Sequence, residues 1–417
     1  MVMQFGVLVT KCPAIDSGFQ LPFDKQKIQV LIYSHAFAPR IGGVQTLVMS
    51  LAKGLAGRNT DGMSIQVTVA TPTPRGAFDD ASLPFAVVRQ PSLRQLVRLI
   101  RAADVIHLGG PAFLPLIFGL LMGKQVVVEH SVYQSICPNG LLLDERTKTA
   151  CPGHFMNGRY GQCWSCNAAN QSRGKSLALL LFTFPRRWMC KKVARNVVPT
   201  AHVGRRVELP RTVTIYHGVP DSPVPPLAEV PSPATAVTFA YVGRLVSEKG
   251  LNLLLESARR LHAEGAAFHL KFIGDGPERA GLEAAVDKFE LRPRVTFTGY
   301  LQGDNMERAL AGVTALVMPS IWEETAGLSA MEHMMRSRLV IAADIGGLGE
   351  LVDGAGLKFP MGDIDALASC MKRVIDDPAL AKSLGKMAGE RAQDLFGEKR
   401  MVAEHLALYR QIVGVPV

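Results

Sequence analysis

The sequence lacks a run of apolar residues long enough to cross a membrane. Its longest apolar stretch, "PAFLPLIFGLLMG" at residues 111–123, is interrupted by prolines and a glycine. A spanning helix needs about 20 apolar residues. At the N-terminus, Lys11 follows a brief apolar stretch where a secretory signal would place its cleavage site. We therefore expect a cytoplasmic protein without a spanning helix, and the sequence indicates no role for residues 1–26.

Acidic residues are missing from one long window. Residues 146–207 contain twelve Lys and Arg and no Asp or Glu, so this window carries a charge of +12. The rest of the chain sums to −2, which gives the net charge of +10. Its densest part, "RGKSLALLLFTFPRRWMCKKVARN" at residues 173–196, combines apolar and aromatic residues with cations. One interpretation is contact with an anionic membrane surface or a phosphorylated acceptor, and the other is a core helix with a solvated basic face. No nucleic-acid-binding pattern accompanies the charge.

Four of the seven cysteines lie close together in the sequence, as Cys137, Cys151, Cys163 and Cys166. In a cytosolic protein such a group favours metal binding over disulfides. Four thiolates would hold a structural zinc with no open coordination position. The alternative is a set of ordinary reduced thiols.

The order of strand-like and helix-like segments indicates two α/β domains. Strand patterns such as "KIQVLIYS", "IQVTVA", "DVIHLG" and "QVVVEH" are separated by helix-length segments, which predicts a parallel sheet covered on both faces. Six prolines between Pro220 and Pro233 interrupt this alternation, and "AVTFAYVG" begins it again. We therefore predict a first domain over residues 1–225 with a cysteine-rich insertion at about 137–166, a second domain over 226–395, and a helix over 396–417 that packs back on the first.

The sequence also lacks a complete dinucleotide fingerprint. Neither "PRIGGVQ" in the first domain nor "IGDGPE" in the second has the GxGxxG pattern, which disfavours a dehydrogenase. What the second domain does have is "YVGRLVSEKG", in which a strand ends at Gly243 and two cations, Arg244 and Lys249, precede the next helix. Paired cations at a strand end suit a diphosphate.

A second group of polar residues lies in "PSIWEETAGLSAMEHM" at residues 319–334. Gly327 permits close approach to a ligand, and the amides that follow it begin a helix able to bind phosphate. Glu324 precedes this helix and Glu332 lies inside it, so the two carboxylates can contact different parts of one extended, hydroxyl-rich ligand.

Together these motifs resemble a known family. "GRLVSEKG", "IGDGPE", "PSIWEETAGLSAMEHM" and "AADIGGLGELV" are similar to the donor-binding half of retaining glycosyltransferases of family 4, and "FAPRIGGVQ" resembles that family's N-terminal glycine loop. The resemblance implies the GT-B fold, with two Rossmann-like domains facing across a cleft. The region after "EHSVYQSICP" resembles a cysteine-bearing insertion of some members.

The resemblance also implies roles for individual residues. Arg244 and Lys249 would bind the donor diphosphate, and Gly42 and Gly43 would approach it from the first domain. Glu332 would bind the ribose and Glu324 the transferred sugar, assisted by backbone amides near Gly243, Gly327 and Leu328. His130 would lie near the reacting centre, although a lone histidine at a strand end is as often a packed structural residue.

The reaction implied is retaining transfer from a UDP- or GDP-sugar to a hydroxyl of a saccharide or lipid-linked acceptor. In the implied mechanism Arg244, Lys249 and the helix N-terminus replace a metal, so no DxD-type motif is needed and we expect no catalytic metal. The position where the family usually has asparagine in an Asn-Gly-Val-Asp turn is His217, in "YHGVPD". Two other classes remain open: an epimerase or phosphorylase of the same fold, and a noncatalytic adaptor that binds the inner face of the cytoplasmic membrane through residues 173–196.

Overall fold

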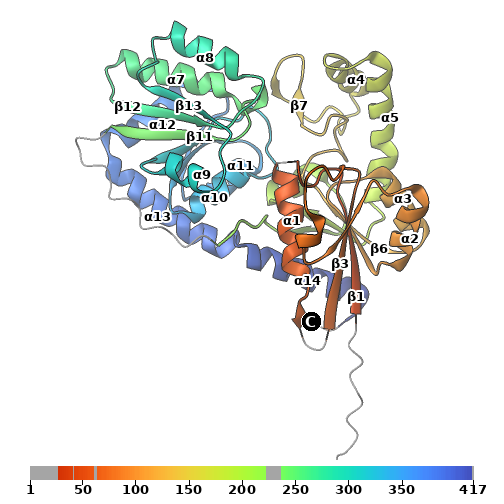
Figure 1. Ribbon diagram of the computed structural model, residues 1–417. Helices are drawn as coiled ribbons and strands as arrows, with labels where there is room; N and C mark the ends of the chain where they lie inside the picture. The colour runs from red at the N-terminus through yellow and green to blue at the C-terminus, as the bar shows by residue number, and fades with distance from the viewer. Residues whose placement is uncertain (1–26, 41, 61–62, 222–235, 416–417) are drawn as a thin grey trace, which may run out of the picture.

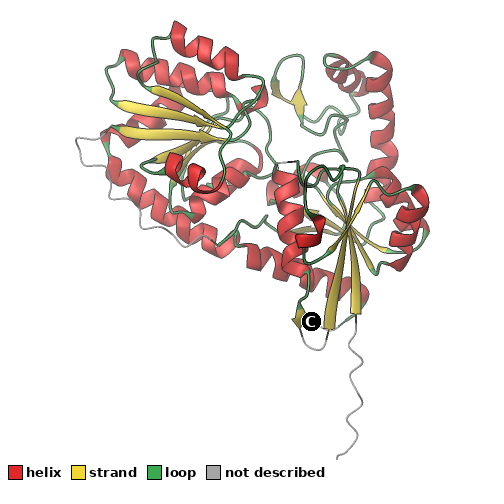
Figure 2. Ribbon diagram, viewed as in Figure 1, coloured by secondary structure: helices red, strands yellow, loops and turns green. Residues whose placement is uncertain are grey.

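The computed structural model describes residues 27–40, 42–60, 63–221 and 236–415. These residues form two α/β domains with a helix-covered parallel sheet each, which confirms the predicted pair of Rossmann-like domains (Figure 1). Figure 2 shows the two sheets as separate layers, each with helices on both faces. Within the described residues, no helix is both long enough and apolar enough to span a bilayer.

The first domain is built on an eight-stranded sheet in the order β10-β9-β6-β5-β1-β3-β2, with β4 beside β3. All neighbours are parallel except β2 and β3. The central strands are buried on both faces, which explains their continuous apolar sequences. The strands are β1 (Lys27–Tyr33), β2 (Asn59–Thr60), β3 (Met63–Thr71), β4 (Ala86–Arg89), β5 (Val105–Leu108), β6 (Gln125–Glu129), β9 (Arg195–Val198) and β10 (Thr212–Thr214).

Helices α1 (Gly43–Leu55), α2 (Leu93–Ala102), α3 (Phe113–Leu121) and α6 (Ala201–Val207) belong to this domain. Between β6 and β9 the chain forms the cysteine-bearing insertion, with a short hairpin of β7 (Leu143–Asp144) and β8 (Thr149–Ala150), then α4 (Tyr160–Ala168) and α5 (Arg173–Cys190). In Figure 1 this insertion rises beside the gap between the domains, with α5 on the outer side of the first domain.

The second domain has a six-stranded, all-parallel sheet in the order β13-β12-β11-β14-β15-β16. Its strands are β11 (Val237–Val242), β12 (Phe268–Ile273), β13 (Val295–Gly299), β14 (Ala315–Met318), β15 (Leu339–Ala343) and β16 (Leu357–Phe359). Its helices are α7 (Leu251–Ala263), α8 (Arg279–Lys288), α9 (Gly303–Leu310), α10 (Leu328–Met335), α11 (Gly346–Leu351), α12 (Ile364–Asp376) and α13 (Pro378–Leu395).

Two crossings connect the domains. The first runs through residues 217–221, and most of the predicted proline-rich linker lies outside the described residues. The second lies between α13 and α14 (Glu398–Val413). The crossings touch, because the Val219 amide donates to Phe396 O at 2.8 Å and the Glu398 amide donates to Val219 O at 3.0 Å. Helix α14 packs against α1 and the first domain's sheet.

A buried polar cluster attaches α14 to the first sheet. Glu129, at the end of β6, accepts from His107 Nε2 at 3.0 Å and His217 Nε2 at 2.9 Å. The Tyr409 hydroxyl on α14 lies 2.9 Å from His107 Nδ1. These hydrogen bonds hold the pKa of Glu129 well below its usual range despite burial that acts to raise it. His217, which stands where the resembled family has asparagine, is therefore a partner of a buried carboxylate near the first crossing.

Candidate active site between the two domains

The carboxyl ends of β11 and β12 come together through two glycines. A β-carbon at Gly274, where φ is 142°, would lie 1.9 Å from the Gly243 carbonyl oxygen. Only glycine adopts such a backbone at this closeness. The Gly243 amide donates to Ile273 O at 3.0 Å, which ties the two strand ends. Arg244 therefore leaves the sheet at the edge where open α/β folds bind ligands.

A buried ion pair lies next to this edge. Lys249 Nζ is 2.9 Å from Glu324 Oε1, and the two side chains are 16 % and 4 % exposed. The Ser320 hydroxyl also donates to Glu324. The Lys249 ammonium lies 5.4 Å from the centre of the Trp322 ring, a cation–π distance. Two predicted residues are thus in direct contact, and the carboxylate is fixed by a cation and a hydroxyl.

The glycine loop of the first domain reaches the second domain at the start of α10. A β-carbon at Gly43 would lie 3.2 Å from Leu328 Cδ1, so these two predicted residues face each other across the cleft. Gly42 precedes α1 and Gly327 precedes α10, and neither helix has a side-chain cap at its N-terminus. The first amides of α10 therefore have no capping side chain, which leaves them available to an anion.

Arg244 and Glu332 lie outside the ion pair. The Arg244 side chain is 71 % exposed, and its ion pair with Glu248 Oε1 is long, at 3.8 Å, so little fixes its position. Glu332 is partly buried on α10, where burial raises the pKa of its carboxyl group and Arg336 partly opposes that effect. Among the described residues, Glu332 forms no hydrogen bond or ion pair with Lys249, Glu324 or Arg244.

His130 is fully buried at the end of β6. Its Nε2 lies 2.9 Å from Asn196 Oδ1, and its Nδ1 lies 3.4 Å from the Ser135 hydroxyl. Burial lowers its pKa to about 4, opposed by the hydrogen bond with Asn196, so the imidazole is neutral near pH 7. The next residue connects it to the second domain, because Thr325 Oγ1 donates to Ser131 O at 2.8 Å. His130 is thus close in sequence to a cleft contact but is itself held by the first domain.

Two further glutamates of the second domain are bound by helix α6 of the first. Glu323 pairs with Arg206 through two bonds of 2.8 and 3.0 Å, and its Oε2 lies 2.9 Å from His202 Nε2. Glu350, on α11, accepts from the backbone amides of Ala201 at 2.9 Å and His202 at 2.7 Å. Carboxylates at a helix N-terminus are stabilised by its unpaired amides and its dipole. These contacts fix the two domains across the cleft.

The sequence did not indicate several polar groups near Glu324. Ser131 Oγ, the Tyr133 hydroxyl and Trp322 Nε1 are buried and have no hydrogen-bond partner among the described residues. Burial raises the pKa of Tyr133 well above its usual range, and the charges of Glu323 and Glu324 add to that effect. Buried polar groups are normally paired, so unpaired ones in a cleft indicate where a polar ligand binds. Trp322 lies within the predicted motif, although no role was predicted for it, whereas the two first-domain residues lie almost 200 positions away.

The four predicted zinc ligands all lie in the insertion, but among the described residues no three of their sulfur atoms come within 4.8 Å of one another. Each is under a tenth exposed. The Glu145 amide donates to Cys166 Sγ at 3.3 Å, and the Asn139 side chain contacts both Cys137 and Cys166. Burial raises the pKa of Cys137 to about 11 and of Cys163 to about 12. Among the described residues, the tighter set of ligand-type atoms, within 4.8 Å of one another, is His107, Glu129 and His405.

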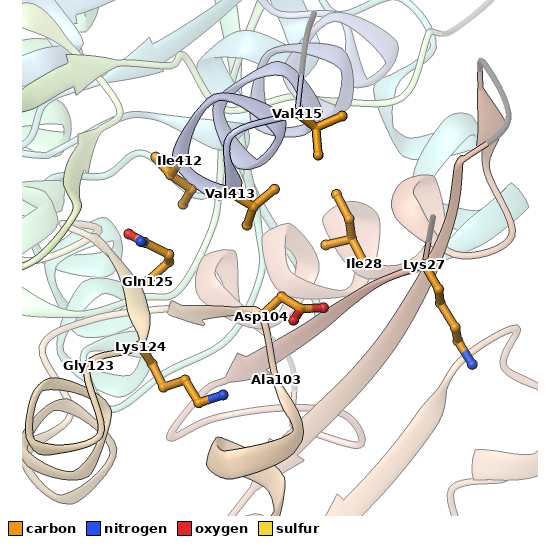
Figure 3. A pocket seen from close by; sticks show the side chains of 10 residues that line it. All are labelled: Lys27, Ile28, Ala103, Asp104, Gly123, Lys124, Gln125, Ile412, Val413 and Val415. Atoms are coloured by element: carbon orange, nitrogen blue, oxygen red, sulfur yellow. The ribbon is translucent and has the colours of Figure 1, made fainter. Parts of the chain in front are cut away.

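An open pocket lies on the far side of the first domain. Lys27, Asp104 and Gln125, at or next to the amino ends of β1, β5 and β6, line it together with the end of α14 (Figure 3). Ligands of parallel α/β sheets bind at the carboxyl ends of the strands. The cleft residues described above therefore form the stronger candidate site.

The model of one known protein family matches part of this chain. Residues 228–391 match the family described as glycosyl transferases group 1. This part of the chain is thus similar to the group 1 glycosyl transferases. The match includes Arg244, Lys249 and Glu324, and thus the whole buried ion pair.

Relatives from several organisms match less than half of this chain. The 2-deoxystreptamine glucosyltransferase of Streptomyces kanamyceticus is 35 % identical over 178 residues, which is 42 % of this chain and 46 % of that protein. The lipopolysaccharide core biosynthesis glycosyltransferase LpsD of Rhizobium meliloti is 31 % identical over 191 residues, 45 % of this chain and 54 % of that protein. The alignments thus span about half the length of these relatives.

Solved structures match almost the whole chain. Sucrose-phosphate synthase of Thermosynechococcus elongatus superposes with a TM-score of 0.71 at 22 % identity, covering 93 % of this chain and 99 % of that one. Anabaena HepE in complex with UDP gives a TM-score of 0.67 at 16 % identity, covering 91 % and 100 %. At such identities the likeness establishes the fold, and the predicted GT-B arrangement of two Rossmann-like domains is confirmed.

The contact between Lys249 and Glu324 predicts a stability effect. Lys249→Met leaves Glu324 buried with only the Ser320 hydroxyl as a donor. We expect the free energy of unfolding in urea to fall by about 3 kcal/mol, since removing one partner of a buried pair leaves an uncompensated charge. The double variant Lys249→Met/Glu324→Gln should recover most of this loss. A loss below about 1 kcal/mol in the single variant would contradict a tightly coupled pair.

Proposed function

We propose that the protein is a retaining glycosyltransferase that moves a sugar from a UDP- or GDP-sugar to a hydroxyl of a saccharide acceptor. The observation that carries this proposal is the Lys249–Glu324 pair at the cleft, with an exposed arginine and an uncapped helix N-terminus nearby. Cations and amides suit a diphosphate, and a fixed carboxylate suits sugar hydroxyls. The family match and the UDP bound to HepE support the same donor class.

The diphosphate of the donor would bind where the charges are positive. Arg244 is exposed and weakly held, so its guanidinium can turn toward a phosphate without breaking a strong ion pair. Lys249 keeps Glu324 as a partner and presents a fixed ammonium. The amides at the start of α10, together with the backbone of Gly243 and of Gly42 and Gly43 opposite, would complete the phosphate site.

The two carboxylates would bind the sugar rings of the donor. Glu324 would accept from hydroxyls of the transferred sugar, and the unpaired groups of Ser131, Tyr133 and Trp322 would supply further hydrogen bonds. Glu332 would accept from the ribose hydroxyls. Burial raises the pKa of Glu332, and a hydrogen-bonding diol is one way to stabilise its ionised form.

Bond breaking and bond formation would occur on the same face of the sugar. The bond from the anomeric carbon to the diphosphate breaks, the acceptor oxygen bonds to that carbon, and the acceptor proton passes to the departing phosphate oxygen. The charge that develops on the phosphate is stabilised by Arg244, Lys249 and the α10 amides, which take the place of a metal ion. His130, neutral and held by Asn196, would position the sugar rather than accept the proton.

The acceptor is proposed from chemistry and from the relatives' names. LpsD acts in lipopolysaccharide core biosynthesis, and the Streptomyces relative is named for a 2-deoxystreptamine acceptor. The acceptors that these names indicate are hydroxyl-bearing saccharides or their analogues. We place the reaction in the cytoplasm at the inner face of the cytoplasmic membrane, with a lipid-linked saccharide as the acceptor.

Donor binding can be measured without knowing the acceptor. A panel of UDP- and GDP-sugars should contain one that stabilises the protein by about 2.7 kcal/mol when present at a hundred times its Kd. Arg244→Ala and Lys249→Ala should each weaken that donor's binding by about 2 kcal/mol, roughly thirtyfold in Kd, because each removes a charge-assisted hydrogen bond. Isothermal titration gives the Kd directly.

Lys288→Ala provides the matched control, since Lys288 is an exposed cation on α8 of the same domain. It should leave donor affinity unchanged. If no sugar nucleotide bound even at millimolar concentration, the noncatalytic adaptor would become the better account.

We also propose that Cys137, Cys151, Cys163 and Cys166 hold a structural zinc. Four buried thiols within one short segment, one of them accepting a backbone N–H, fit the donor set of such a site. Zinc would offset the burial that raises the pKa of Cys137, Cys163 and Cys166, since bound thiolates are stabilised by the ion's charge. It would stabilise the fold of the insertion and take no part in sugar transfer.

Metal analysis tests this site. We expect about one zinc per chain in protein purified without chelator, and loss of that zinc in Cys163→Ser/Cys166→Ser. Cys370→Ser is the control, because Cys370 is a buried free cysteine on α12 in the second domain. Protein that is fully folded and zinc-free would show that the thiols are ordinary reduced cysteines.

A further inference from the structure

Large apolar side chains on the surface are concentrated on two neighbouring helices. Of the eleven exposed large apolar or aromatic side chains among the described residues, seven lie on α3 and α5. Four of those on α5 recur at helical spacing, and two on α3 are seven residues apart. They are Leu177 (48 %), Leu181 (58 %), Phe184 (40 %), Trp188 (62 %), Leu114 (52 %) and Leu121 (78 %), and Phe182 is the seventh.

These side chains do not belong to the core-facing side of α5. Ser176, Leu180 and Thr183 follow the opposite stripe of the helix and are buried. Phe113 of α3 and Phe182 of α5 meet edge to face with ring centres 5.3 Å apart, so the two helices present one surface. We call this surface the α3/α5 face, defined by the seven exposed residues. A contiguous apolar surface of this kind marks an interaction site.

Helices α3 and α5, and α2 beside α3, carry charge of one sign only. Helices α2, α3 and α5 contain no Asp or Glu. Exposed cations lie at both ends of α5, namely Arg173 and Lys175 before the stripe and Lys191 and Lys192 after it. Lys192 Nζ lies 5.9 Å from the centre of the Trp188 ring, so a cation and an indole share one end of the face.

Not every cation of residues 173–196 faces outward. Arg186 donates to Gln134 O at 3.4 Å, and Arg187 donates to Val207 O at 2.7 Å and to Glu208 O at 3.3 Å. These two arginines are partly buried and hold α5 to the first domain. The surface charge therefore comes from the ends of α5, and Arg186 and Arg187 are unsuitable for testing a surface interaction.

We propose that the α3/α5 face docks onto a lipid bilayer that contains anionic lipids. Apolar stripes that lie parallel to the surface would enter the boundary between headgroups and acyl chains, as amphipathic interfacial helices do. Lys191, Lys192, Arg173 and Lys175 would contact anionic headgroups, and Trp188 is suited to the headgroup level. The absence of acidic residues from all three helices favours this occupant over a protein surface of mixed charge.

The place of this face in the fold leaves the cleft accessible. In Figure 1, α3 and α5 lie on the side of the first domain away from the second, and α5 continues from the insertion beside the gap between the domains. Docking there would leave the second domain unhindered. The docking itself does not depend on the proposed transfer reaction, and it is measured without donor or acceptor.

Flotation of the full chain with lipid vesicles tests the proposal. Wild type should bind phosphatidylcholine vesicles that contain phosphatidylglycerol and should bind pure phosphatidylcholine at least tenfold more weakly. Lys191→Glu/Lys192→Glu should lower the affinity for anionic vesicles by at least about thirtyfold, and Leu181→Glu/Trp188→Glu by about tenfold or more. Trp188 fluorescence should shift to the blue on binding.

Matched controls lie on the second domain. Met387→Glu alters an exposed apolar side chain on α13, and Lys382→Glu/Lys386→Glu reverses two exposed cations of that helix. Both should bind like wild type. Unchanged binding in the α3/α5 variants, or no binding of wild type to anionic vesicles, would overturn the proposal. Binding that appeared only after deletion of residues 1–26 would assign the face to that segment, and a dimer abolished by Trp188→Glu would assign it to a second copy.

Discussion

The site depends on how helix α6 binds two glutamates of the opposite domain. Glu323 and Glu350 would each be a surface carboxylate in an isolated second domain, and α6 gives them an arginine, a histidine and two backbone amides. Glu323 is adjacent to Glu324, so the contact that joins the domains also fixes the backbone of the buried ion pair. The contact between the domains and the placement of the Lys249–Glu324 pair therefore depend on the same stretch of backbone.

The cations of the cleft divide into a fixed one and a mobile one. Lys249 is already paired and buried, whereas Arg244 is exposed and weakly held. A fixed charge acts on the departing phosphate without reorganisation, which is the basis of electrostatic catalysis. An exposed arginine can instead follow the diphosphate as it enters and leaves. In the proposed reaction, these two cations would do the work that a metal ion does at other diphosphate sites.

The sequence was sufficient to predict the two-domain fold and the two separate motifs that contain Lys249 and Glu324, but not their ion pair, because only the fold and the motifs follow from local patterns. Alternation of strands and helices has a short period, and the residues of each motif lie within a few positions of one another. The contacts of Arg206 with Glu323 and of Thr325 with Ser131 join residues more than a hundred positions apart, and no local pattern encodes such pairs. The sequence likewise could not separate the inward-facing Arg186 and Arg187 from the outward-facing Lys191 and Lys192, since that depends on how α5 packs.

The stereochemistry of sugar release tests the central claim most directly. Proton NMR can follow the anomeric signal of the sugar formed when the protein slowly hydrolyses its preferred donor in the absence of acceptor. We predict that the first sugar to appear has the anomeric configuration of the donor, because attack and departure occur on the same face. Release of the opposite anomer would contradict the assigned roles of Glu324, Lys249 and Arg244, and would require a base on the far side of the sugar.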